Sequence, residues 1–247
     1  MINIIFTIIL FNVLLVIFKL FKRYKINNLQ ALTINYLTMS ICCYFLQNKQ
    51  NIFIDLFHQE WILYAILIGS LFILTFYLFA YSSQNIGVAV TTIANKMSVI
   101  IPVAFALILY PTDDFNITKI IGYILAITGL YLCVFTKEIY VKKKYMWIII
   151  GVFVGQGLLD VMFNHIVQTL LIGLDYYYFT ILFLIAFIVG VIILLFQIKY
   201  SPIKIRFKNI YWGILFGIIN LFTMIFFVKA LNIINSATVY STVSIGI

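Results

Sequence analysis

Residues 176–197 read YYYFTILFLIAFIVGVIILLFQ, an apolar run without a single charged side chain. A helix needs about 20 such residues to cross the hydrocarbon core of a bilayer. The rest of the 247-residue chain has the same character, because 65% of its residues are apolar and only 9% are charged. In soluble domains, apolar residues average roughly 45–50% and charged residues about 25%. The sequence therefore predicts an all-α polytopic membrane protein and excludes a soluble domain.

Eight further stretches resemble this one in hydropathy, and all but the last resemble it in length. With it they make nine expected spans, at 2–20, 29–47, 61–81, 86–110, 117–136, 146–171, 176–197, 210–231 and from about 235 onward. We expect helices, because backbone polar groups in lipid must be satisfied within a helix or a closed barrel and these runs show no strand-like alternation. The last stretch reaches only about half a span before Ile247. The sequence thus predicts a chain that is incomplete at its C-terminal end.

The distribution of basic residues predicts how the chain is oriented across the membrane. Three links carry most of the basic residues, and they fall on one side if the spans alternate. These residues are Lys19, Lys22, Arg23, Lys25, Lys137, Lys142, Lys143, Lys144, Lys199, Lys204, Arg206 and Lys208. Links rich in Lys and Arg stay in the cytoplasm. We therefore expect a multi-pass protein of the plasma or inner membrane with its N-terminus outside, and the net charge of +9 points to lipid rather than to nucleic acid.

An internal repeat is visible at an offset of 150 residues. The stretch AYSSQNIGVAVTT at 80–92 aligns with ALNIINSATVYST at 230–242. Five expected spans separate the two copies, and because five is odd the copies should lie in opposite orientations across the bilayer. Inverted repeats of this kind build many secondary transporters, with a binding site near the midplane where the repeats meet.

These stretches resemble a known family. The run from Ala80 to Leu132 is similar to the end of the first EamA repeat of the drug/metabolite transporter superfamily, with its proline at Pro102 and glycines at Gly122 and Gly129. The stretch KALNIINSATVYSTVSIGI at 229–247 resembles the same place in the second repeat. The resemblance implies ten helices in two inverted five-helix repeats, here 1–139 and 140–247, and transport of small metabolites by alternating access.

The chain departs from this family in two places. EamA repeats often carry a glutamate between helices 4 and 5, where this chain has Asp113 and Asp114. About nine of the ten helices are present, and the last is partial.

Two charged residues are expected at mid-depth, where ionisable groups are expensive and default to functional candidates. Asp160 lies about 21 Å into its span at 1.5 Å per residue, just past the middle of a core of about 30 Å. Lys96 lies close to the midplane of the span at 86–110. The two could form an ion pair, or Asp160 alone could take up and release a proton. A structural ion pair without a transport role is the alternative.

Polar neutral residues at helical spacing complete the expected substrate pathway. With the two charges, the candidates are Asn12, Asn95, Lys96, Asp160, Asn164, Asn220, Thr238 and Ser241. The alternative for each amide or hydroxyl is an interhelical hydrogen bond that only holds helices together, at about 0.6 kcal/mol.

No catalytic constellation is present in the sequence. It has no G-x-S-x-G, no H-E-x-x-H and no phosphate-binding glycine loop. We therefore expect no enzyme, no cofactor and no metal. The sequence favours a secondary carrier for an amino acid, nucleoside or sugar-like metabolite, acting as a monomer or homodimer, with protons as an alternative coupling partner. An intramembrane lipid-linked group transferase and a non-transporting membrane subunit or fragment remain the alternatives.

Overall fold

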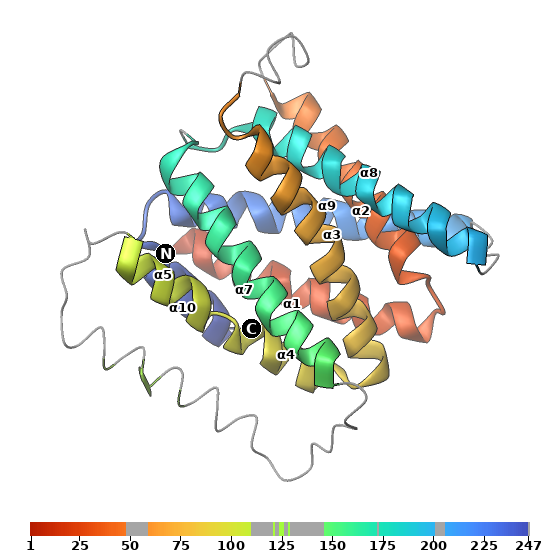
Figure 1. The fold of residues 1–247 in the computed structure, drawn as a ribbon, viewed down its shortest axis with the longest axis horizontal. Helices are drawn as coiled ribbons and strands as arrows, with labels where there is room; N and C mark the ends of the chain where they lie inside the picture. The colour runs from red at the N-terminus through yellow and green to blue at the C-terminus, as the bar shows by residue number, and fades with distance from the viewer. Residues whose placement is uncertain are drawn as a thin grey trace.

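The computed structural model describes residues 1–47, 59–109, 121, 124, 125, 128, 146–171, 173–200 and 206–246. The expected span at 117–136, and Asp113 and Asp114, lie outside the described residues except for isolated positions. The described chain is helical and contains no strand (Figure 1). Its helices are α1 (Ile2–Arg23), α2 (Asn28–Leu46), α3 (Ile62–Asn85), α4 (Val88–Met97), α5 (Ile100–Leu109), α7 (Met146–Thr169), α8 (Tyr176–Tyr200), α9 (Phe207–Leu231) and α10 (Ser236–Gly246).

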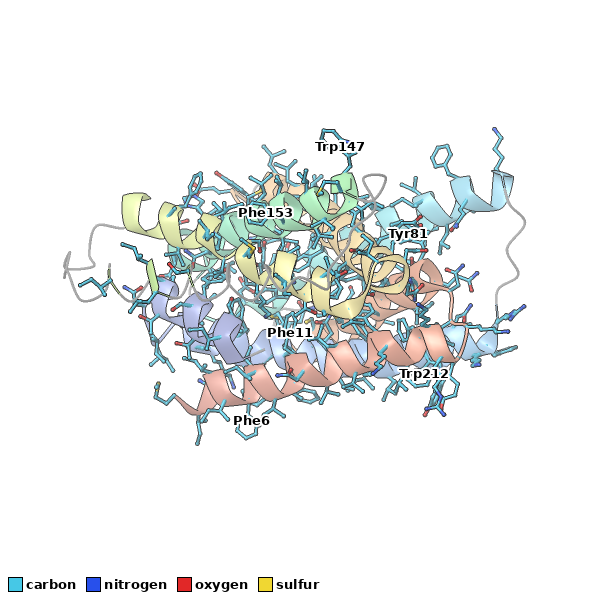
Figure 2. The ribbon with its side chains drawn as sticks, turned by 90° about the horizontal axis from the view of Figure 1, so that it is seen from below. Phe6, Phe11, Tyr81, Trp147, Phe153 and Trp212 are labelled. Carbon is cyan, nitrogen blue, oxygen red and sulfur yellow. The ribbon has the colours of Figure 1, made fainter. Side chains whose placement is uncertain are left out.

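Seven stretches of the described chain are long and apolar enough to cross a bilayer. Six are the helices α1, α2, α3, α7, α8 and α9, and the seventh, Val88–Phe105, runs through α4 into α5. Large apolar side chains cover the outside, as Phe6 and Trp147 do in Figure 2. Because such a surface needs lipid around it, the chain is an all-α, multi-pass membrane protein, as the composition predicts.

The expected single helix at 86–110 is divided in two. α4 ends at Met97 and α5 begins at Ile100, with Ser98 and Val99 between them. Pro102 explains the position of this break, because a proline lacks the N–H that would bond to the carbonyl of Ser98, and its ring clashes with that carbonyl. The Ser98 carbonyl instead accepts from the Ile101 N–H at 3.0 Å, three residues on, which tightens the turn.

The two halves of the chain pack in matching ways. α1 contacts α9 and α7 contacts α3; α2 contacts α9 and α8 contacts α3; α3 contacts α4 and α9 contacts α10. α1 also contacts α10, while α7 contacts both α4 and α5. If α1 is exchanged with α7, α2 with α8, α3 with α9 and α4–α5 with α10, each contact named here is converted into another contact named here. The contact of α2 with α3 is the exception, because no comparable contact of α8 with α9 is found among the described residues.

Glycines permit close helix crossings in both halves. A Cβ atom added at Gly69 of α3 would lie 2.7 Å from the Leu182 carbonyl of α8, and one added at Gly217 of α9 would lie 2.9 Å from the Asn35 carbonyl of α2. The exchange of halves converts the first crossing into the second. Small residues are what allow helix backbones to approach this closely in membranes.

Candidate functional site

A cavity of about 140 Å³ lies between α1, α3, α4, α7, α9 and α10. Its wall is mostly apolar and includes the rings of seven phenylalanines, Phe11, Phe18, Phe72, Phe76, Phe79, Phe163 and Phe227. Its polar lining consists of Thr7, Asn95, Lys96, Gln156, Asp160, Asn220, Thr223, Tyr240 and Ser244. Figure 2 shows Phe11 on the inner side of α1, opposite to Phe6. The cavity is thus a mainly apolar space with a few polar groups, the usual composition of a small-molecule site.

Lys96 enters this cavity from the last turn of α4, just before the break in the helix. Its side chain is 8% exposed, and its Nζ lies 4.8 Å from the centroid of the Phe11 ring. The negative face of an aromatic ring attracts a cation. Within the described part of the chain, the structure records neither a hydrogen bond from this ammonium group nor an ion pair with a carboxylate.

Asp160 faces the same cavity from the middle of α7. Its Oδ1 accepts a hydrogen bond from Gln156 Nε2 at 2.9 Å, one helical turn earlier. Its backbone carbonyl accepts from the Tyr240 hydroxyl of α10 at 3.0 Å. The second carboxylate oxygen has no protein partner among the described residues. Asp160 and Lys96 therefore share one cavity without forming an ion pair.

Asn220 of α9 is the third polar group whose orientation the structure defines. Its Nδ2 donates to the Oδ1 of Asn35 at 3.2 Å and contacts the Sδ of Met39 at 3.3 Å, both on α2. Because the amide nitrogen is directed at α2, the side-chain oxygen is the atom that remains for the cavity. Asn95, half-buried on α4, also lines the space.

Four of the eight predicted residues line this cavity, and four lie elsewhere. Asn12 donates to the carbonyls of Ile8 and Gly246, so its amide links α1 to α10. Asn164 is buried away from the cavity, and Thr238 is exposed. Ser241 donates to the Thr238 carbonyl of its own helix at 3.1 Å. The substrate-pathway role of all eight stays a prediction.

Sequence reasoning missed Gln156, Tyr240 and the phenylalanine wall. Gln156 had a detectable signal, since it lies four residues before Asp160 and therefore on the same helix face. The three tryptophans, Trp61, Trp147 and Trp212, lie near the starts of α3, α7 and α9 and do not line the cavity. The rings that build the cavity belong to phenylalanines spread along α1, α3, α7 and α9, and no local pattern distinguishes them from core residues.

Comparison with known proteins gives one informative match. A protein of Haemophilus influenzae described as uncharacterized is 25% identical over 259 aligned residues, covering 99% of this chain and 85% of its own length. No known protein family matches the sequence, and no solved structure matches it either. The similarity therefore extends over all the helices that build the cavity, without naming an activity.

Proposed function

We propose that this chain is a secondary transporter that carries a small metabolite through the cavity by alternating access, as an EamA-type member of the drug/metabolite transporter superfamily. The observation that carries the proposal is the pair Lys96 and Asp160, which face one cavity in a membrane bundle without an ion pair between them. Charges inside a membrane protein are expensive and mark substrate or ion pathways.

The matching contacts of the two halves support the inverted-repeat part of this proposal. Exchanging α1–α5 with α7–α10 reproduces nearly every helix contact. Transporters built from inverted repeats hold their substrate where the repeats meet. The cavity has this position, since α1, α3 and α4 of one half and α7, α9 and α10 of the other line it.

The break between α4 and α5 supports the same reading. Discontinuous membrane helices occur at transporter binding sites, and irregular backbone at membrane depth is tolerated where it lines a cavity. Val99 lies in the break and lines the cavity, three residues after Lys96 along the chain.

Contacts at one end of the bundle support the expected orientation. Lys208 Nζ donates to the Tyr24 carbonyl at 2.7 Å, so the basic link after α1 lies beside the basic start of α9. Two basic clusters at the same end agree with a cytoplasmic location for that end. In this orientation the N-terminus is outside, in the plasma or inner membrane.

Uptake into proteoliposomes tests the proposal. The purified protein should accumulate a labelled metabolite from an amino acid, nucleoside and sugar panel when an inward proton gradient is imposed. Asp160→Asn should abolish proton-driven uptake, because the amide keeps the shape of the side chain and cannot exchange a proton. The matched control is Asp175→Asn, since Asp175 lies outside the cavity and accepts the Tyr177 N–H at the start of α8. Gradient-driven uptake at the same rate in wild type and Asp160→Asn would refute proton coupling through Asp160. No uptake of any compound would refute the transport proposal.

A further inference from the structure

We propose that the cavity binds a small zwitterion with an apolar body, its anionic group at Lys96 and its ammonium group at Asp160 and Asn220. The transport of this ligand rests on the proposed function, but its binding does not.

Lys96 provides the anion-binding end. Its ammonium group has three N–H donors, and in the described structure its contact is the face of Phe11. The side chain is 8% exposed and lines the cavity, so the space open to the ammonium group is the cavity. A buried charge needs a partner of opposite sign, and a ligand carboxylate would supply one.

Asp160 and Asn220 provide the opposite end, where the cavity offers acceptors. The Asp160 carboxylate uses Oδ1 for Gln156 and leaves its other oxygen for a ligand. Asn220 lines the cavity and uses its amide nitrogen for Asn35 and Met39, so its carbonyl oxygen has no protein donor among the described residues. Acceptor atoms without protein donors select a ligand group rich in N–H, and the negative charge of Asp160 favours an ammonium.

The size of the shared cavity favours one ligand over two separate ions. Both charges line one cavity of about 140 Å³, and a cavity of about 150 Å³ lined by apolar side chains holds one benzene molecule. A single compact molecule that carries both charges satisfies both ends and fills the space between them.

The wall disfavours the more polar candidates. Most of its residues are apolar, phenylalanines from four helices among them, so it offers few hydrogen bonds for the many hydroxyl groups of a sugar or of a ribose. A buried hydroxyl group that finds no partner weakens binding. Among amino acids, nucleosides and sugars, an amino acid with an apolar side chain fits the wall and both polar ends.

Binding to the full chain in lipid nanodiscs tests this inference by calorimetry with two probe trios. The first trio is L-phenylalanine, 2-phenylethylamine and 3-phenylpropionate, which share one body and differ in charge. The second is L-leucine, 3-methylbutylamine and 4-methylpentanoate, which have a smaller body. In at least one trio the zwitterion should bind at least tenfold more tightly than either singly charged probe, the advantage expected of a hydrogen-bonded charge.

Variants assign each end of the ligand. Lys96→Met should reduce zwitterion affinity to that of the amine, and Asp160→Asn should reduce it to that of the acid. Lys229→Met and Asp175→Asn change the same residue types outside the cavity and should leave all affinities unchanged. Equal binding of zwitterion and singly charged probes in both trios, or no binding in either, overturns the inference, as does tighter binding of glucose or uridine.

The two proposals fail in distinguishable ways. If the zwitterion binds more tightly than the singly charged probes but is not taken up into proteoliposomes, the transport proposal is refuted and the binding site is supported. If a sugar or nucleoside is taken up and the zwitterion does not bind more tightly, transport is supported and the proposed ligand class is refuted.

Discussion

Replacing Gly157 with alanine should separate α7 from α5 beside the cavity. Gly157 lies one turn before Asp160, and an added Cβ would lie 2.9 Å from Ile101 Cβ and 3.0 Å from its Cγ1. Carbon atoms in contact are about 3.5–4.0 Å apart, so the helices would have to separate by roughly 0.6–1.1 Å. Isoleucine cannot rotate its Cβ away, and its branched side chain is stiff at χ1. We expect overpacking to lower stability by about 1–3 kcal/mol.

Gly151→Ala is the matched control on the same helix. An added Cβ there would meet only Leu78 Cδ1, at 3.4 Å, the end of a flexible side chain. Both substitutions gain the same helix propensity, about 1 kcal/mol over glycine, so their difference isolates the contact with Ile101. At about 2–4 °C per kcal/mol, Gly157→Ala should melt roughly 2–12 °C below Gly151→Ala, as followed by tryptophan fluorescence in detergent.

A double variant tests the stated cause. Ile101→Ala removes the Cγ1 and Cδ1 atoms that the new methyl would meet, so it should relieve part of the penalty of Gly157→Ala, with a coupling energy of at least about 0.5 kcal/mol. Equal melting temperatures for Gly157→Ala and Gly151→Ala, or strict additivity with Ile101→Ala, would refute the close α5–α7 contact.

Two further predictions concern the break and the orientation. Pro102→Ala returns an N–H to the break between α4 and α5, so it should raise the melting temperature and slow uptake; faster uptake would contradict a role for the break in transport. In a background without native cysteines, Glu60→Cys should react with an impermeant thiol reagent added outside whole cells, whereas Lys25→Cys should react only after the cells are opened; the reverse pattern would invert the topology.

The helices themselves were largely predictable, because length and hydropathy decide which segments can span a bilayer. The expected 29–47 and 176–197 correspond to α2 (Asn28–Leu46) and α8 (Tyr176–Tyr200) within a few residues. The division of 86–110 was not predicted, although its signal, Pro102, stands in the sequence. A hydropathy profile averages over many residues and does not register a single proline, whereas the hydrogen bond that the proline removes changes one turn of the helix.

The site was predictable only in part, because the sequence gives polarity but not the rotation of each helix. Their charge at mid-depth was enough to identify Lys96 and Asp160, because a charge on a lipid-facing side of a helix would be unfavourable. An asparagine carries no such penalty when it bonds to a neighbouring backbone carbonyl, as Asn12 does with Gly246. Which of the predicted asparagines turn toward the cavity follows from the packing of helices far apart in the sequence, and that packing is visible only in the structure.

Thiol labelling of the cavity from each side of the membrane tests the central claim most directly. Ser244 lines the cavity from α10, and Ser244→Cys replaces only its hydroxyl oxygen with a reactive sulfur. In proteoliposomes without native cysteines, we predict that a charged thiol reagent reaches this cysteine from outside and from inside, and that bound substrate slows both reactions. Ser70→Cys, whose position on α3 does not line the cavity, is the control and should stay unlabelled. Labelling of Ser244→Cys from one side only, or from neither, would contradict alternating access through this cavity.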